Sequence, residues 1–302
     1  MQLIQGSDLK MNKTCVTFGY FDSMHKGHQS VISRLIEEES RGFSSVLLFL
    51  EKEKLGISDK KSNIYTKDER IKLIDKNGPM FIAHVPFDGA IAVMEPEEFI
   101  KEILVNRFGA KVIVSGNNCR FGRNGKGNIQ TLKKLSDKYG YELVSCETVH
   151  HENKEITDDW IHYEITQGDL KTANALLGQP FTLWGDVIHG KALGRRFGMP
   201  TANLKLPENK IIPKHGVYAT LSNIDGVWIK GLTNIGRRPS VDDHTHVSIE
   251  TYLLDFSGNL YGKEVRLELH HYIRSVKKFN NLEEVTQQVK LDIINAETLL
   301  LT

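Results

Sequence analysis

The first residues that could do chemistry lie between an apolar run and a helical pattern near the N-terminus. Residues 18–28 have the sequence Phe-Gly-Tyr-Phe-Asp-Ser-Met-His-Lys-Gly-His. Glycines let backbone amides approach a polyphosphate, and a helix N-terminus supplies partial positive charge. Two histidines spaced in this way could both donate to an α-phosphate as pyrophosphate leaves. We predict a nucleotide site at Asp22, His25, Gly27 and His28; the alternative is a capped helix start with two surface histidines.

A second group occupies residues 185–204, Gly-Asp-Val-Ile-His-Gly-Lys-Ala-Leu-Gly-Arg-Arg-Phe-Gly-Met-Pro-Thr-Ala-Asn-Leu. The Thr201 hydroxyl and the Asn203 amide oxygen are hard ligands suited to Mg²⁺ held jointly with ATP, so we predict that both bind the metal. The predicted contacts to ATP and its phosphates are Gly190, Lys191, Gly194, Gly198 and Thr201. A long hairpin loop with a Pro-Thr turn is the alternative, but loops of this length and glycine content are usually functional.

Alternating element types in the first half predict how the first group is positioned. Short apolar runs at 16–18, 46–49, 81–83, 112–114 and 142–145 alternate with helical patterns at 29–40, 66–76, 96–107 and 129–139. Strand and helix repeated in this way imply right-handed crossovers and a parallel sheet with helices on both faces. We therefore expect an α/β, doubly wound, nucleotide-binding domain.

The second half has an all-β pattern that ends in a helix. Its predicted strands are 182–189, 217–224, 227–234, 247–254 and 264–273, separated by turn signals such as Asp225-Gly226. This pattern predicts an antiparallel β-barrel or sandwich. Residues 282–301 return to helical spacing and predict a C-terminal helix packed on the barrel. We place the domains at 1–178 and 179–302, with a short helix at 169–177.

Composition excludes several function classes. Lys and Arg number 39 against 38 Asp and Glu, so the net charge of +1 indicates no nucleic-acid partner and no acidic membrane surface. Three cysteines without metal-ligand spacing argue against a disulfide framework or a zinc site. The N-terminus lacks a signal-peptide pattern, and no apolar run could span a bilayer. We expect a cytoplasmic protein.

Both chemical groups resemble one known family. Segment 18–28 resembles the signature of the nucleotidylyltransferase superfamily, in particular the adenylylating module of bacterial riboflavin kinase/FAD synthetases. Residues 116–122, Gly-Asn-Asn-Cys-Arg-Phe-Gly, resemble that module's G-x-D-F-x-F-G loop on the flavin side. The second half resembles a riboflavin kinase domain, with matching segments in the family's order at 216–219, 234–239, 249–252 and 260–263.

The resemblance implies roles for two further residues. In the family, the glutamate at the position of Glu250 is the general base on the ribityl 5′-hydroxyl, and a carboxylate can orient and deprotonate an alcohol that attacks the γ-phosphate of ATP. Without the resemblance, strand alternation would make Glu250 a solvent-facing residue. Arg274 matches the segment after the family's last strand, which implies a flavin or nucleotide contact; a solvated basic patch is the alternative.

The adenylylating half departs from the family at four places. Residues 156–162 have the sequence Ile-Thr-Asp-Asp-Trp-Ile-His where the family has an ISSTxIR-like segment that holds the triphosphate. Asn118-Cys119 replaces Asp-Phe, Ser23 replaces a glycine, and residues 50–53 lack an F-x-P-H-P stretch. Carboxylates near a polyphosphate repel it, and histidine lacks the permanent charge and bidentate fork of arginine. These changes predict that adenylyl transfer is weak, altered or absent.

Our leading hypothesis is therefore an ATP- and Mg²⁺-dependent riboflavin kinase that makes FMN, with a partly degenerate FAD-synthetase-like module. The first alternative is a fully bifunctional enzyme that also adenylylates FMN to FAD. The second alternative is an N-terminal module that binds flavin or nucleotide without catalysis and has a regulatory role. The implied small-molecule partners are riboflavin, FMN and ATP.

Overall fold

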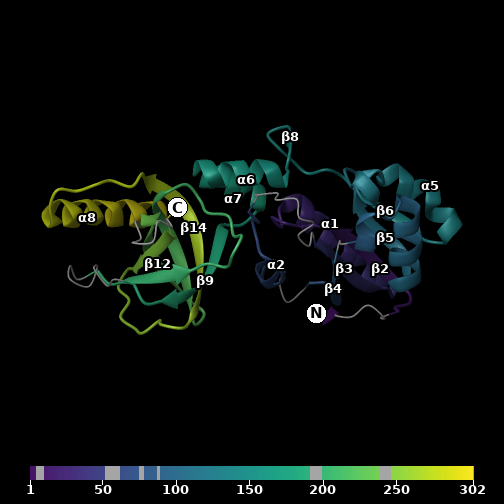
Figure 1. The fold of residues 1–302 in the computed structure, drawn as a ribbon, viewed down its shortest axis with the longest axis horizontal. Coiled ribbons are helices and arrows are strands. Elements are labelled where there is room, and N and C mark those ends of the chain that lie inside the picture. Colours follow the sequence, from purple (N-terminus) through teal and green to yellow (C-terminus); the bar gives the residue numbers. More distant parts are fainter. Residues whose placement is uncertain are drawn as a thin grey trace. The chain divides into compact units, whose positions relative to one another are not determined.

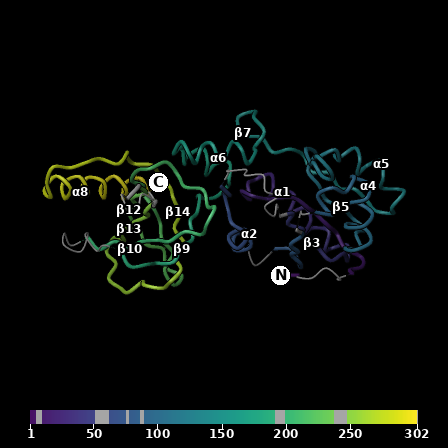
Figure 2. The backbone as a smooth tube through the Cα atoms, viewed as in Figure 1, coloured from purple at the N-terminus to yellow at the C-terminus, as the bar shows by residue number. Residues whose placement is uncertain are grey.

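The chain folds into two compact units, each with its own sheet. The computed structural model describes residues 1–4, 10–51, 62–74, 78–86, 89–190, 199–238 and 246–301, and Figures 1 and 2 follow the chain through them. One unit comprises Met1–Lys61 and Lys67–Thr157, and the other Ser62–Thr66 and Asp158–Thr302. The predicted fold class is confirmed: a parallel sheet, a closed antiparallel barrel and a C-terminal helix. The predicted boundary at 178/179 stays a prediction; the compact units divide before residue 158.

The first unit is built on a six-stranded sheet whose neighbouring strands are all parallel. In spatial order, the strands are β1 (Gln2–Ile4), β4 (Phe81–Pro86), β3 (Ser44–Glu51), β2 (Thr14–Gly19), β5 (Ala110–Gly116) and β6 (Glu142–Cys146). All five predicted strands are present. The short edge strand β1 was not predicted.

Helices cover both faces of this sheet, and each face has its own core. The helices are α1 (Lys26–Glu37), η1 (Glu38–Arg41), α2 (Lys67–Leu73), α3 (Gly89–Ala92), α4 (Pro96–Glu98), which continues into the π-helix η2 (Phe99–Arg107), η3 (Arg123–Gly125) and α5 (Ile129–Tyr139). One core joins Val16, Val46 and Leu48 with η2 and α5. The alternate residues Cys15 and Leu47 pack with α1 on the other face. This two-residue alternation is what a strand buried on both faces requires.

Strand order identifies where this unit can bind a ligand. The chain runs from β2 through β3 to β4 on one side, and then continues with β5 and β6 on the other side of β2. Such a reversal leaves a crevice beyond the carboxyl ends of the two strands that flank it. Loop 20–25 follows β2 and loop 117–122 follows β5. Both predicted ligand segments of the first unit therefore lie at this switch point.

The second unit is a closed barrel with helices outside it. Its strands, in spatial order, are β10 (Thr201–Lys205), β13 (His246–Leu253), β12 (Val227–Arg238), β11 (Gly216–Ile224), β14 (Glu264–Arg274) and β9 (Phe181–Ile188), all antiparallel to their neighbours. The helices are α6 (Asp158–Gln167), α7 (Leu170–Leu177) and α8 (Leu282–Leu299). A hairpin of β7 (His150–His151) and β8 (Lys154–Glu155) precedes α6 in the chain.

Two sets of contacts stabilise the barrel. The buried hydroxyls of Thr220, Thr233 and Thr251 form a ladder with 2.9 Å between neighbours, so these polar side chains satisfy one another. Outside, α8 packs Ala296 against β11 and β12. Strand β10 and helix α6 were not predicted: we expected residues 201–204 at the end of a loop, and residues 156–162 to replace the segment that holds the triphosphate in the family.

Residues 62–66, which we call the strap, belong to the second unit although they lie within the first half of the chain. The backbone N–H of Asn63 donates to Asn209 O at 2.7 Å, and Ile211 N–H donates to Asn63 O at 2.8 Å. The Nζ of Lys210, a residue only 4% exposed, donates to Ile64 O at 2.7 Å and lies 4.3 Å from the ring centroid of Tyr65. The strap thus satisfies a buried ammonium group that an apolar core alone could not hold.

Truncation of the strap's aromatic anchor should destabilise the second unit. Tyr65 is fully buried, so Tyr65→Ala should cost about 3 kcal/mol and lower the melting temperature of this unit by roughly 6–12 °C. All three tryptophans, Trp160, Trp184 and Trp228, belong to the second unit, so their fluorescence reports its unfolding. Tyr163→Ala, which removes a 59% exposed ring on α6, is the matched control. Equal melting temperatures for the two variants would contradict the anchoring role.

Candidate functional site

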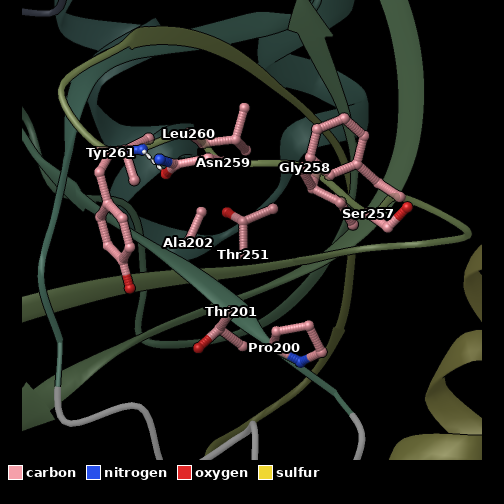
Figure 3. Close-up of a pocket in the computed structure, with 12 residues that line it drawn as sticks. Pro200, Thr201, Ala202, Thr251, Ser257, Gly258, Asn259, Leu260 and Tyr261 are labelled. Atoms are coloured by element: carbon pink, nitrogen blue, oxygen red, sulfur yellow. Dashed lines mark hydrogen bonds between the residues drawn. The ribbon is translucent and has the colours of Figure 1, made fainter.

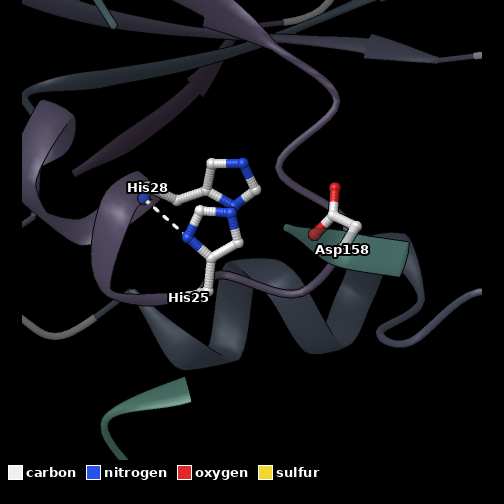
Figure 4. A group of neighbouring side chains, drawn as sticks. All are labelled: His25, His28 and Asp158. Carbon is white, nitrogen blue, oxygen red and sulfur yellow. Dashed lines mark hydrogen bonds between the residues drawn. The ribbon is translucent and has the colours of Figure 1, made fainter. Parts of the chain in front are cut away.

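His25 caps the N-terminus of α1 with its ring. Its Nδ1 accepts hydrogen bonds from the backbone N–H of Gly27 at 2.9 Å and of His28 at 3.2 Å. Because Nδ1 is an acceptor, the neutral ring carries its proton on Nε2. The His28 ring stacks on the His25 ring with centroids 3.7 Å apart, as Figure 4 shows. The two imidazoles therefore lie together at a helix N-terminus, where anions bind.

A glycine and two strained residues shape the turn that presents these rings. A Cβ on Gly27 would lie 2.7 Å from Cε1 of His25, so only glycine lets the ring fold back over the helix start. Phe21 and Met24 have φ of 50° and 53°, a region that costs energy for large side chains, and both are buried. Ser23, where the family has glycine, is buried outside that left-handed region. Serine at this position therefore requires no strained backbone.

The loop after β5 is held at both of its ends. Phe121 packs edge-on against Phe18 with ring centroids 5.4 Å apart, which anchors the loop in the core. Asn118 Nδ2 donates to Glu155 Oε1 on β8 at 2.6 Å. Burial raises the pKa of the neighbouring Cys119 thiol. The asparagine that replaces the family's aspartate thus has a carboxylate partner within the same unit.

Asp158 and Asp159 form the first turn of α6. Carboxylates at this position interact favourably with the partial positive charge of a helix N-terminus. Repulsion of a bound triphosphate is therefore not their only electrostatic effect. Their place at the start of α6 favours the helix.

The predicted kinase residues form a row on neighbouring barrel strands. Asn203 on β10 pairs with Glu250 on β13, and Glu250 pairs in turn with Asn234 on β12. Directly opposed residues of antiparallel strands project from the same face. Thr201 shares this face because it lies two residues from Asn203 on the same strand. The barrel therefore brings the predicted metal ligands and the predicted base to one surface.

Gly190 lies directly against the Asn203 side chain. A Cβ at residue 190 would lie only 2.3 Å from Asn203 Nδ2, and Asn203 is 8% exposed. Since the amide is short and buried, it could not move aside at low cost. This close approach is a packing reason for the glycine, in addition to any contact with phosphate.

A pocket opens beside this row, with a cavity volume of about 490 Å³. Its lining comes from Val187 on β9, the start of β10, the end of β13 and loop 256–261. Figure 3 shows Ala202 and Thr251 on one side of β10 and Thr201 on the other, with the Tyr261 ring beside them; all four line the pocket. The pocket is mainly apolar with a few hydroxyl and amide groups, the usual lining of a small-molecule site.

The remaining predicted residues have different outcomes. Lys191, Gly194 and Gly198 lie outside the described residues. The Nε of Arg274 donates to both carboxylate oxygens of Asp292 on α8 at 3.0 Å, which ties the helix to β14. The predicted flavin contact of Arg274 stays a prediction.

Comparison with known proteins follows the same division of the chain. A riboflavin kinase family model matches residues 177–300, and an FAD synthetase model matches residues 8–159. A bifunctional riboflavin kinase/FMN adenylyltransferase of Bacillus subtilis (strain 168) is 33% identical over 93% of this chain and 90% of its own. The chain belongs to this bifunctional riboflavin kinase/FMN adenylyltransferase family. The Escherichia coli (strain K12) member is 30% identical over 98% of this chain and 97% of its own.

A solved structure also matches both halves. It is described as a macrolide-efflux protein from Streptococcus pneumoniae, with a TM-score of 0.85, 26% identity, and coverage of 97% of this chain and 95% of the other. Among the described residues, no helix is both long enough and apolar enough to cross a membrane.

The packing of Gly27 gives a prediction for the His25 ring. Gly27→Ala should push the ring away and break the cap, so the imidazole should change from the Nε2–H tautomer to a mixture of tautomers. Nitrogen-15 NMR of histidine-labelled protein at about pH 8 reports the tautomer directly, because the neutral ring dominates well above the usual pKa. Gly140→Ala is the control: it also strains the backbone, at φ of 66°, but at the end of α5, where open space surrounds the added methyl group. An unchanged His25 tautomer in Gly27→Ala would show that the ring does not cap the helix.

Proposed function

We propose that the chain is a bifunctional enzyme that phosphorylates riboflavin to FMN with the second unit and adenylylates FMN to FAD with the first. The observation that carries this proposal is the full-length match to relatives named for both activities. It favours the bifunctional alternative over a kinase with a degenerate partner module. Local structure also accommodates three of the departures: Asn118 donates to Glu155, Ser23 is buried without a left-handed backbone, and Asp158 and Asp159 lie at the N-terminus of α6.

In the proposed kinase reaction, ATP occupies the pocket beside β10. The Thr201 hydroxyl and the Asn203 amide oxygen are oxygen donors on one strand face, and they fit a magnesium ion held with ATP. The metal would neutralise charge on the phosphate oxygens. Glu250 accepts the proton of the ribityl 5′-hydroxyl as that oxygen attacks the γ-phosphorus, and ADP leaves. The apolar lining suits the base of ATP.

In the proposed adenylyl transfer, a phosphate oxygen of FMN attacks the α-phosphorus of ATP and pyrophosphate leaves. His25 presents Nε2–H at the helix N-terminus, and the stacked His28 ring lies beside it. Donors that are already oriented toward the developing negative charge need little reorganisation when the transition state forms, so they stabilise it effectively. Loop 117–122, across the switch point, would meet the flavin.

Product analysis tests both activities. Full-length protein with riboflavin, ATP and Mg²⁺ should accumulate FMN and then FAD; with FMN, ATP and Mg²⁺ it should form FAD and pyrophosphate. Chromatography of the flavins over time resolves these steps. FMN without FAD in both reactions would reinstate the kinase-only hypothesis, and loss of all turnover would contradict the proposal.

Single substitutions should separate the two reactions. Glu250→Gln removes the proposed base and should lower FMN formation by a factor of about 10²–10⁴, with little change in FAD formation from supplied FMN. His28→Ala should do the reverse, because it lies in the first unit. Each variant is thus the control for the other, measured in the same two assays. A variant that impaired both reactions equally would argue against separate sites.

A further inference from the structure

His189 follows the last residue of β9, and its ring stacks on the Tyr261 ring with centroids 3.8 Å apart and planes inclined by 24°. Tyr261 lines the pocket, and its backbone N–H donates to Asn259 Oδ1 at 3.1 Å within the same loop (Figure 3). Packed aromatic pairs contribute stability beyond their buried area. The imidazole therefore lies on a residue of the pocket wall.

Backbone pairing explains why the two rings meet. The N–H of Val187 donates to Lys263 O at 2.9 Å, and the N–H of Gly262 donates to Val187 O at 2.9 Å. These bonds align the end of β9 with the residues that follow Tyr261. Val187 itself lines the pocket, and His189, two residues further on, projects from the same face of the chain.

The residue after His189 contacts the proposed metal ligand. Gly190 lies against the Asn203 side chain, so closely that a Cβ would overlap its amide. Residues 187–190 thus contact, in sequence, the pocket, the tyrosine of its wall and the proposed metal ligand. A shift of this short segment would change the spacing between the wall and Asn203.

We propose that His189 is a positioning residue for the nucleotide: its stack on Tyr261 holds the pocket wall in register with Asn203 and so sets the affinity of the kinase site for ATP. This rests on the proposed kinase function. The flat face of the imidazole ring performs this role, so no proton transfer from the imidazole is required. It therefore differs from the charge-stabilising role proposed for His25 and His28.

A kinetic split tests the role in the full chain. His189→Ala should raise the KM for ATP in FMN formation about threefold to tenfold, the ratio that corresponds to loss of one aromatic stack. The kcat and the KM for riboflavin should change less than twofold. His189→Phe keeps a ring that can stack, and it should restore the KM for ATP. A purely electrostatic role for the histidine would leave His189→Phe as impaired as His189→Ala.

A double-mutant cycle with Tyr261→Leu identifies the partner. If His189 acts only through its stack on Tyr261, the double variant should have nearly the same KM for ATP as Tyr261→Leu alone, since the stack is already lost in that variant. Multiplied effects on KM, or an unchanged KM in His189→Ala, would overturn the proposal. Melting curves from tryptophan fluorescence show whether a variant has simply lost its fold.

Failure of this inference is distinguishable from failure of the proposed function. Wild-type protein that forms FMN while His189→Ala keeps a normal KM for ATP would refute the positioning role alone. Wild-type protein without FMN formation would refute the kinase function and the positioning role together. In all His189 variants, the KM for ATP in FAD formation from FMN should stay within twofold of wild type, because the first unit carries that reaction.

Discussion

Pairing between β9 and β10 is the interaction on which the second unit depends, because it closes the barrel. It places Ile188 opposite Asn203, which in turn faces Glu250 across the next strand pair. Closure also brings Gly190, two residues after the end of β9, against the Asn203 amide. A barrel without this pair of strands would have open edges and no fixed distance between the proposed ligand and the proposed base.

The first unit depends on a different constraint, the reversal of strand order between β2 and β5. All neighbouring strands are parallel, so the loops that follow them gather at one edge of the sheet. Phe21 and Met24 then adopt strained, left-handed backbone conformations, and the chain turns sharply into α1. Burial of both side chains holds that conformation, and His25 satisfies the amides at the helix start. Core packing thus supports the turn on which the proposed chemistry depends.

Periodicity was sufficient to predict most of the fold, and the misses have physical causes. In β10, the inward residues Ala202 and Leu204 alternate with polar ones, but five residues after a proline are too few to reveal a strand without its partners. Helix α6 has two buried side chains, Ile161 and Ile165, one turn apart. Two buried apolar positions in ten residues are too few to distinguish this helix from a loop by spacing alone.

The candidate site was predictable in its residue types but not in its supports. The motifs named Thr201, Asn203 and Glu250, yet the close approach of Gly190 and the stack of His189 on Tyr261 depend on strand register. Four departures from the family predicted weak, altered or absent adenylyl transfer. In the folded chain, Asn118 has a carboxylate partner, and Ser23 is buried without a left-handed backbone. The free-energy cost of a substitution depends on what the side chain contacts, and a sequence motif does not contain this information.

The strap imposes an order on folding that chain direction alone would not suggest. Ile64 and Tyr65 are fully buried, but their partner Lys210 lies 146 residues after Ile64 in the chain. During synthesis, the first unit can form its sheet early, since domains generally fold as units from the N-terminus. The strap cannot be buried until β9 and Lys210 have been made. The strap, which lies between β3 and α2 of the first unit, must therefore stay unburied until the barrel forms. Completion of the second unit thus depends on a segment from the first half of the chain.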